Sequence, residues 1–187
     1  RLTALSGNLN TWKWLETQIG SYTLRAEFPN PLDGSMLEGH VEMTLHLLET
    51  VRIPMETNYI TNSIKTNSKA AFLATLFDRG HISFNRATCS SILLRSSFVG
   101  NLEVLKMMNY FGIGLYVRDN AGDTILHKAC KGEHVNVVRW LLKHGAASWH
   151  AKNDAGLSAL ESVLHRPNPE ILTLLRETNV IGAHRGF

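Results

Sequence analysis

The side chains that could do chemistry in this sequence are nine histidines, two cysteines and scattered carboxylates. A zinc site needs three or four ligands that converge tetrahedrally. His144 and His150 are six residues apart, with His165 further along, and this spacing does not form such a set. Cys89 and Cys130 form no ligand pair, and Cys89 has no identifiable base partner to activate its thiol. We therefore expect no metal site and no cofactor.

The carboxylates fall where turns and helix starts are expected, and they do not form a catalytic pair. These positions are occupied by Asp119, Asp123, Asp154 and Glu161. There they can cap helix ends and complement the helix dipole. The chain also has no glycine-rich phosphate loop, no nucleophile elbow and no His-Glu-x-x-His motif. We therefore predict that this chain is not an enzyme and has no small-molecule substrate.

The composition excludes several classes of partner. Of the 187 residues, 44% are hydrophobic and 19% are charged, and the formal net charge is +3. This balance is typical of an ordered protein. Lysine and arginine are scattered and do not form the stripe typical of nucleic-acid binders, so we do not expect a nucleic-acid partner. No apolar run approaches the ~20 residues of a membrane span.

The number of cysteines indicates the cellular compartment, and the first residues indicate how the sequence begins. Only two cysteines and no Asn-x-Ser/Thr acceptor are present, which favours a reducing compartment over secretion. We expect an intracellular, cytoplasmic location, with the nucleus and a host-cell cytoplasm as alternatives. The chain starts at Arg1, inside a helical pattern that is already under way. We therefore expect a fragment of a longer protein.

The elements that must position these residues repeat along the chain. Ser91 and Thr124 each begin an Ile-Leu pair and are 33 residues apart, and Gly112 and Gly145 repeat at the same spacing. A fixed period of this size indicates stacked repeats rather than one globular core.

The clearest unit runs from Asp119 to Ala146. Its Asp-Asn-Ala-Gly start predicts a turn, and Thr124 stands where the N-cap of a short helix is expected. A second helix follows, and Gly145 suits its C-terminal stop. That helix carries two apolar i,i+4 pairs, formed by Val137, Val138, Leu141 and Leu142.

This unit resembles the ankyrin repeat. The matching residues are Asp119, Gly122, Thr124-Ile-Leu-His127, Ala129, Val137-Val138, Leu141-Leu142 and Gly145-Ala146. Ile125 stands where the family prefers proline, and Glu133 separates the usual Gly-His pair. The resemblance implies an all-α solenoid of helix-turn-helix units joined by short β-hairpin-like turns. A helical solenoid of another family is the alternative, which the Asp-x-x-Gly turns and glycine-ended second helices disfavour.

The resemblance implies a single array over residues 1–187. The expected units are 1–29 (partial), 30–58, 59–90, 91–123, 124–157 and 158–187. It also implies a hairpin tip at residues 87–90, which would leave Cys89 exposed. The histidines of the motif are expected to be structural, namely His40, His127 and His134. Trp12, Trp14 and Trp140 are expected to pack in the core or on the back face.

The function that the resemblance implies is recognition of another protein or a peptide through the concave face and the hairpin tips. The candidate contact residues are Phe98, Val99, Asn120, Asp123, Lys131, Trp149, Asp154, Leu157, His165 and Arg166. Phe98 and Val99 form an apolar pair where polar or small residues are usual, which indicates a contact patch. The alternative is a substrate-recruiting arm of a larger enzyme, or of a bacterial effector, whose catalytic domain lies outside this chain.

Overall fold

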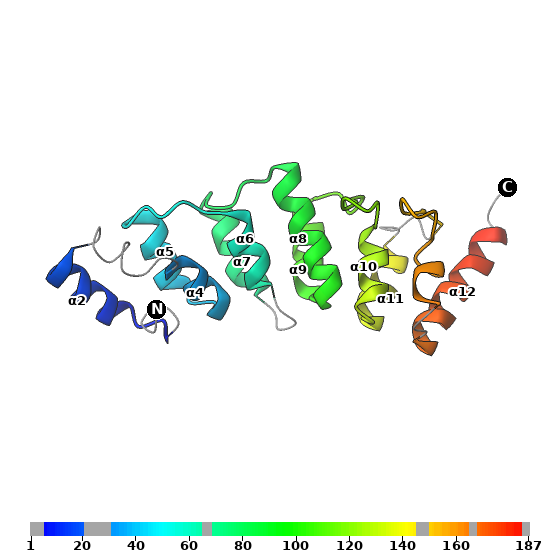
Figure 1. Ribbon diagram of the computed structural model, residues 1–187, viewed down its shortest axis with the longest axis horizontal. Coiled ribbons are helices and arrows are strands. Elements are labelled where there is room, and N and C mark those ends of the chain that lie inside the picture. Colours follow the sequence, from blue (N-terminus) through cyan, green and yellow to red (C-terminus); the bar gives the residue numbers. More distant parts are fainter. Residues whose placement is uncertain (1–5, 21–30, 65–68, 145–149, 165–167, 185–187) are drawn as a thin grey trace. The chain divides into compact units, whose positions relative to one another are not determined.

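The computed structural model describes residues 6–20, 31–64, 69–144, 150–164 and 168–184. Within these ranges the chain forms helices and turns, and the only β-pairing is an isolated bridge between Arg118 and Thr124. The predicted all-α architecture is therefore confirmed (Figure 1). The chain divides into two compact units, residues 1–64 with 71–84 and residues 65–70 with 85–187.

The first unit is built from short amphipathic helices. Its described helices are α2 Leu9–Ile19, α4 Pro31–Glu38, α5 Val41–Glu49, α6 Thr57–Ser63 and α7 Ala70–Asp78. Helix α4 packs against both α5 and α6. The core side chains here are no more than 1% exposed and include Leu32, Met36, Met43, Leu47, Leu73 and Leu76. Each fully buried side chain of this size contributes about 1.5–3 kcal/mol, so packing holds these short helices in place.

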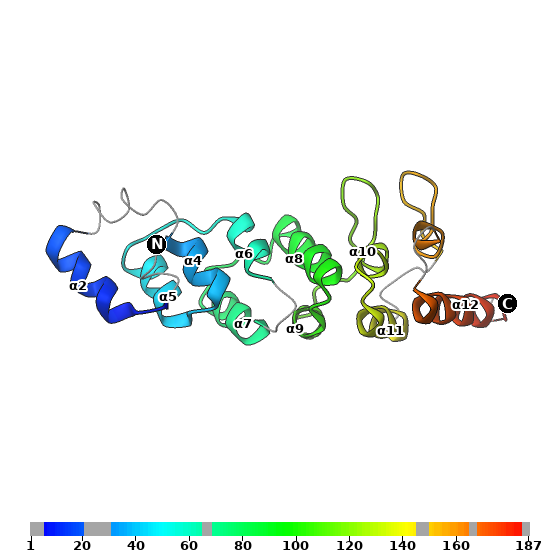
Figure 2. The ribbon, with the colours of Figure 1, turned by 60° about the horizontal axis from the view of Figure 1, so that its bottom comes forward.

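The second unit repeats a pair of helices. Its helices are α8 Arg86–Val99, α9 Leu102–Tyr110, α10 Ile125–Lys131, α11 Val135–Lys143, the 3-10 helix η1 Glu161–Val163 and α12 Pro169–His184. Helix α10 packs against α8, α11 and η1. In Figure 2 the first helices, α8, α10 and η1, lie in one row and the second helices, α9, α11 and α12, lie in another. The loop that precedes α10 in the chain and the loop that precedes η1 both project to the same side of the row of first helices.

The repeating aliphatic positions make the contacts between neighbouring pairs. Ile92, Leu93, Val104, Leu105, Ile125, Leu126, Val138 and Leu141 are all 0% exposed. One helix pair cannot bury such a face alone, and stacking of the next pair covers it. The spacing of these aliphatics therefore accounts for the stacked arrangement of the unit.

The expected hairpin tip at residues 87–90 is wrong. These residues lie inside α8, which begins after Asn85, whose side chain accepts a hydrogen bond from the Thr88 backbone N–H at 2.8 Å. Cys89 is consequently 5% exposed and not at a surface turn. The hairpins that do form place glycines at positive φ, Gly122 at 72° and Gly156 at 75°, and residues 87–90 contain no glycine to take that conformation without strain.

The tryptophans divide between core and surface. Trp12 is 0% exposed, as expected for core packing. Trp14 is 60% exposed, so the expectation that it packs is wrong. Trp140 is partly covered and stacks on the ring of His144, with 4.4 Å between ring centroids.

Candidate protein-interaction surface

The first hairpin, residues 118–124, is fixed by its own polar groups. The Asp119 N–H donates to the Asp123 carbonyl and the Gly122 N–H donates to the Asp119 carbonyl, both at 3.0 Å. One carboxylate oxygen of Asp119 also accepts the N–H groups of Ala121 and Asp123, both at 2.9 Å. This side-chain turn supports the main-chain turn, so the hairpin has one well-defined shape.

The second hairpin, residues 152–158, repeats this design with an amide in place of the carboxylate. The Asn153 N–H donates to the Leu157 carbonyl at 2.9 Å. The side-chain oxygen of Asn153 accepts the N–H groups of Ala155 and Leu157 at 3.1 and 3.0 Å. The sequences Asp119-Asn-Ala-Gly and Asn153-Asp-Ala-Gly therefore fold alike.

The two hairpins are joined edge to edge. The Asp154 N–H donates to the Ala121 carbonyl at 3.0 Å. The Arg118 guanidinium bridges them from the side, because its Nη1 donates to the Gly122 carbonyl at 3.0 Å and to the Lys152 carbonyl at 2.6 Å. The two loops that project in Figure 2 are thus hydrogen-bonded to each other. Residues 118–124 and 152–158 together are called the hairpin ledge below.

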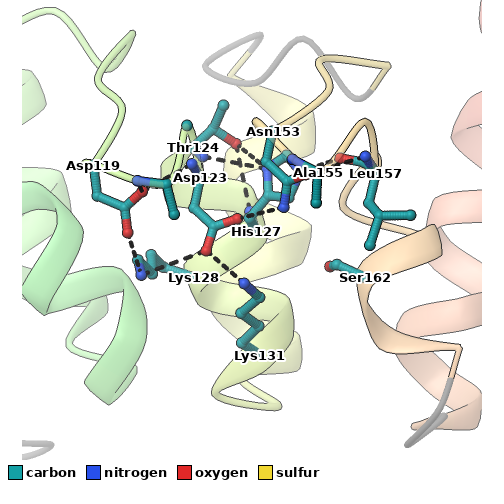
Figure 3. A network of polar contacts seen from close by, with 12 residues as sticks. Asp119, Asp123, Thr124, His127, Lys128, Lys131, Asn153, Ala155, Leu157 and Ser162 are labelled. Carbon is teal, nitrogen blue, oxygen red and sulfur yellow. Dashed lines mark hydrogen bonds and ion pairs between the residues drawn. The ribbon is translucent and has the colours of Figure 1, made fainter.

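A charged network ties this ledge to α10 (Figure 3). Lys128 pairs with Asp119 and Lys131 pairs with Asp123, each at 2.5 Å between Nζ and a carboxylate oxygen. The second oxygen of Asp123 accepts the side-chain amide of Asn153 at 2.9 Å. Asp123 thereby connects one hairpin, the following helix and the next hairpin.

The protonation of this network follows from its contacts. Burial by itself would raise the pKa of Asp119 and of Asp123, but hydrogen bonds from Lys128, Lys131 and neighbouring amides outweigh burial and lower both pKa values. Burial would lower the pKa of Lys128, but the paired carboxylates raise it. The carboxylates of Asp119 and Asp123 and the ammonium group of Lys128 are therefore charged at neutral pH.

His127 performs a structural task. Its Nε2–H donates to the Leu157 carbonyl at 3.0 Å, and its Nδ1 accepts from the Thr124 hydroxyl at 2.8 Å. Thr124 caps α10 and completes a capping box with the same histidine. The ring is 0% exposed, so both nitrogens are occupied and neither is available as a base or ligand. The predicted structural role of His127 is confirmed.

His134 joins two turns at the ends of the first helices. Its Nε2–H donates to the Phe98 carbonyl at 2.9 Å. A Cβ on Gly100 would lie 2.4 Å from the His134 ring, and a Cβ on Gly132 would lie 2.3 Å from the Phe98 oxygen. The first unit uses the same fit, because a Cβ on Gly7 would lie 2.4 Å from the His40 ring. The structural roles predicted for His40 and His134 are therefore supported.

The exposed candidate residues of the second unit occupy the hairpin tips and the ends of first helices. Phe98 is 46% exposed and Leu157 is 39% exposed. Asn120, Lys131 and Asp154 are also exposed, and Val99 is half-buried. Asp123 differs from the expectation of an exposed tip residue, because its network leaves it 1% exposed. The remaining candidates lie outside the described residues: Trp149, His165 and Arg166.

The structure also exposes residues that the sequence analysis did not select. Leu164 is 50% exposed at the end of η1, in the row of first-helix ends that includes Phe98. Tyr116, just before the first hairpin, is 74% exposed. The signal that could have found Tyr116 is an aromatic residue in the glycine-rich segment between α9 and the hairpin.

The described ranges offer neither a metal-binding cluster nor a membrane-spanning helix. They contain no cluster of three or more histidine, cysteine or acidic side chains able to hold a metal ion. None of the helices in the part of the chain that the structure describes is long and apolar enough to cross a membrane.

The family model that matches this chain lies within the second unit. Residues 93–183 fit the family model for ankyrin repeats (3 copies). The chain is 34% identical over 84 residues to protein phosphatase 1 regulatory subunit 27 of Homo sapiens, which covers 45% of this chain and 48% of that protein. The mouse protein of the same name is 36% identical over 58 residues, covering 31% of this chain and 38% of the relative.

A third relative carries the name of an enzyme. An L-asparaginase of Dirofilaria immitis is 32% identical over 82 residues, covering 44% of this chain and 14% of that protein. The chain thus spans less than half the length of each of these relatives. The family match includes both hairpins and the helices that follow each of them, so ankyrin repeats account for residues 93–183.

Proposed function

We propose that the chain is a protein-recognition module that binds a partner protein or peptide through the hairpin ledge and the exposed ends of its first helices. The observation that carries this proposal is that hydrogen bonds and ion pairs hold the hairpins in one conformation while residues at their tips are exposed. Asp123, Asn153 and Lys131 fix the ledge, while Asn120 and Asp154 remain exposed on it. A surface already held in one shape loses little conformational entropy on binding, so a few contacts can set the affinity.

Phe98 is the anchor that we propose for this surface. It is an aromatic side chain, 46% exposed, at the end of α8. Its backbone carbonyl is held by His134, so the residue is fixed although its ring is open to solvent. Large aromatic side chains are over-represented among the residues that dominate binding energies.

The relatives support this class of function without naming a partner for this chain. One of them is by name a regulatory subunit of a phosphatase. The second candidate function is a recruiting arm of a larger enzyme. It is favoured by the L-asparaginase relative, in which the matched segment is 14% of the protein. Under either candidate function, the repeats bind a partner and another chain or domain performs the catalysis.

The test is an affinity measurement on a partner captured from the source cell and identified by mass spectrometry. Phe98→Ala should weaken binding about tenfold or more, in the range of a hot-spot truncation, while the melting temperature stays near that of the wild type. The matched control is Tyr110→Ala, which removes an 86% exposed aromatic side chain at the end of a second helix.

Equal affinities of the wild type and Phe98→Ala, with Tyr110→Ala weakened instead, would refute the proposed face. Turnover of a substrate by the isolated chain would refute the assignment of catalysis to another chain or domain.

A further inference from the structure

The second hairpin shows what the edge of such a hairpin binds. Its Asp154 N–H points toward the preceding hairpin and donates to the Ala121 carbonyl at 3.0 Å. The neighbouring Lys152 carbonyl accepts from the Arg118 guanidinium at 2.6 Å. This edge is therefore occupied by the preceding hairpin of the same chain, whose backbone presents the Ala121 carbonyl to the Asp154 N–H.

The first hairpin presents the same edge, and no backbone group among the described residues of this unit is hydrogen-bonded to it. Asn120 is the counterpart of Asp154, 34 residues earlier and at the same position of the same turn. No hairpin precedes α8 among the described residues of this unit, because Asn85 caps that helix directly. Within the described ranges the Asn120 N–H has no hydrogen-bond acceptor, and the residue is exposed.

Arg118 extends this edge by one more pair of backbone groups. The Asp119 N–H points inward to the Asp123 carbonyl, and backbone groups of successive residues in an extended segment face opposite sides. The N–H and carbonyl of Arg118 therefore face outward, on the side of the Asn120 N–H. They too have no backbone partner in the part of the chain that the structure describes.

We propose that this edge, the backbone of Arg118 and Asn120, receives an extended peptide segment of a partner protein as an added strand. The inference rests on the proposed recognition function and specifies the site and the form of its partner. Exposed strand edges are templates for pairing with another chain, and addition of a strand is an established mode of peptide recognition.

The chemistry of the edge indicates which peptide it fits. The Arg118 guanidinium is already held by two carbonyls, and Asp119 is already paired with Lys128. The surrounding charges are thus balanced, and the donors that remain are backbone groups. The partner segment is recognised by its extended backbone, with a carbonyl opposite Asn120, and binding should depend little on salt.

A pair of proline substitutions tests this directly. Asn120 occupies the second position of a four-residue turn, where proline is favoured, and its φ is not positive. Asn120→Pro therefore removes the N–H while keeping the turn. Asn120→Ala keeps the N–H and removes only the side chain. Asp154→Pro is the internal control, because it removes an N–H that the fold itself uses.

The probe is a single peptide of about ten residues, long enough for a strand, selected on the full chain from a random-sequence display library. We expect Asn120→Pro to bind it roughly fivefold more weakly, as for loss of one hydrogen bond, with an unchanged melting temperature. Asn120→Ala should bind like the wild type. Asp154→Pro should melt at a lower temperature. Peptide binding should also protect the Asn120 amide from hydrogen exchange.

Other outcomes would overturn the proposal in distinguishable ways. If Asn120→Pro binds the peptide like the wild type and Phe98→Ala does not, recognition stands and the edge is wrong. If no peptide is selected while a folded partner binds, the extended segment is wrong. If wild-type chains dimerise and Asn120→Pro stays monomeric, the edge takes a second copy. If neither peptide nor protein binds, the recognition function fails as well.

Discussion

Replacing Gly132 with alanine isolates the close approach between two repeats. Gly132 ends α10 with φ −84° and ψ −2°, a conformation that alanine adopts freely, so the backbone itself does not require glycine. The obstacle is steric, because the new Cβ would lie 2.3 Å from the Phe98 oxygen and 2.6 Å from the His134 ring. The carbonyl would have to move by roughly 1 Å to reach an ordinary carbon–oxygen contact.

The cost of this movement can be worked out from the contacts. Loss of the His134–Phe98 hydrogen bond, 2.9 Å long, costs about 0.5–1.5 kcal/mol. Forcing an extra methyl group into a packed site costs about 1–3 kcal/mol. Alanine recovers about 0.4–1 kcal/mol by restricting the unfolded chain. The net expectation is a loss of about 2 kcal/mol of unfolding free energy.

The matched control is Gly112→Ala, where the backbone conformation disfavours alanine but there is space for its Cβ. Gly112 has φ 72°, but a Cβ there would meet nothing within 4 Å. The left-handed conformation costs alanine about 1–2 kcal/mol, partly offset by the same unfolded-state gain, so we expect a loss of about 1 kcal/mol. Position 132 thus tests space alone, and position 112 tests backbone conformation alone.

Urea denaturation followed by circular dichroism measures both variants. In addition, His134→Ala combined with Gly132→Ala should cost less than the sum of the single changes, because both remove the same hydrogen bond. If Gly132→Ala is neutral or stabilising, or costs less than Gly112→Ala, the reasoning about close approach is refuted.

Three further predictions concern single groups. Glu133 has φ 59°, so Glu133→Gly should raise the unfolding free energy by about 0.5 kcal/mol, since relief of the left-handed conformation exceeds the entropy cost of glycine; a lower urea midpoint would contradict this. The pKa of Asp123 is lowered in the folded chain, so its ionised carboxylate stabilises the fold above the unfolded pKa, and this stabilisation is lost on acidification. The unfolding free energy should therefore fall below about pH 4. It should fall less steeply in Asp123→Asn, which urea denaturation at a series of pH values measures. Burial raises the pKa of Cys130 to about 12 and Cys89 is also buried, so a thiol reagent at pH 8 should label both only after unfolding; rapid labelling of the folded chain would disprove the burial.

Local spacing was sufficient to predict the repeats of the second unit. The N-cap at Thr124 and the aliphatic pairs of α11 depend on neighbours within one or two helical turns, and such preferences are legible in sequence. The error at residues 87–90 came from extending the 33-residue period without its turn chemistry. Cys89 stands where the family has glycine, and Asn85 caps α8 six residues before Ser91, the residue that the 33-residue period aligns with Thr124. The missing glycine was the available signal.

The sequence by itself determined the helix pairs, their caps and the aliphatic faces that stack, because these follow from residues close together in the chain. Only the tertiary structure decided which polar groups of the hairpins are used. Asp123 is buried by a bond to Asn153, 30 residues away, and the Asp154 N–H is satisfied by Ala121 while that of Asn120 has no acceptor among the described residues. Whether a backbone group is paired depends on which residues the neighbouring repeat places beside it. The repeated turn sequence is nearly the same at Asn120 and at Asp154, so it does not show which of the two N–H groups has an acceptor.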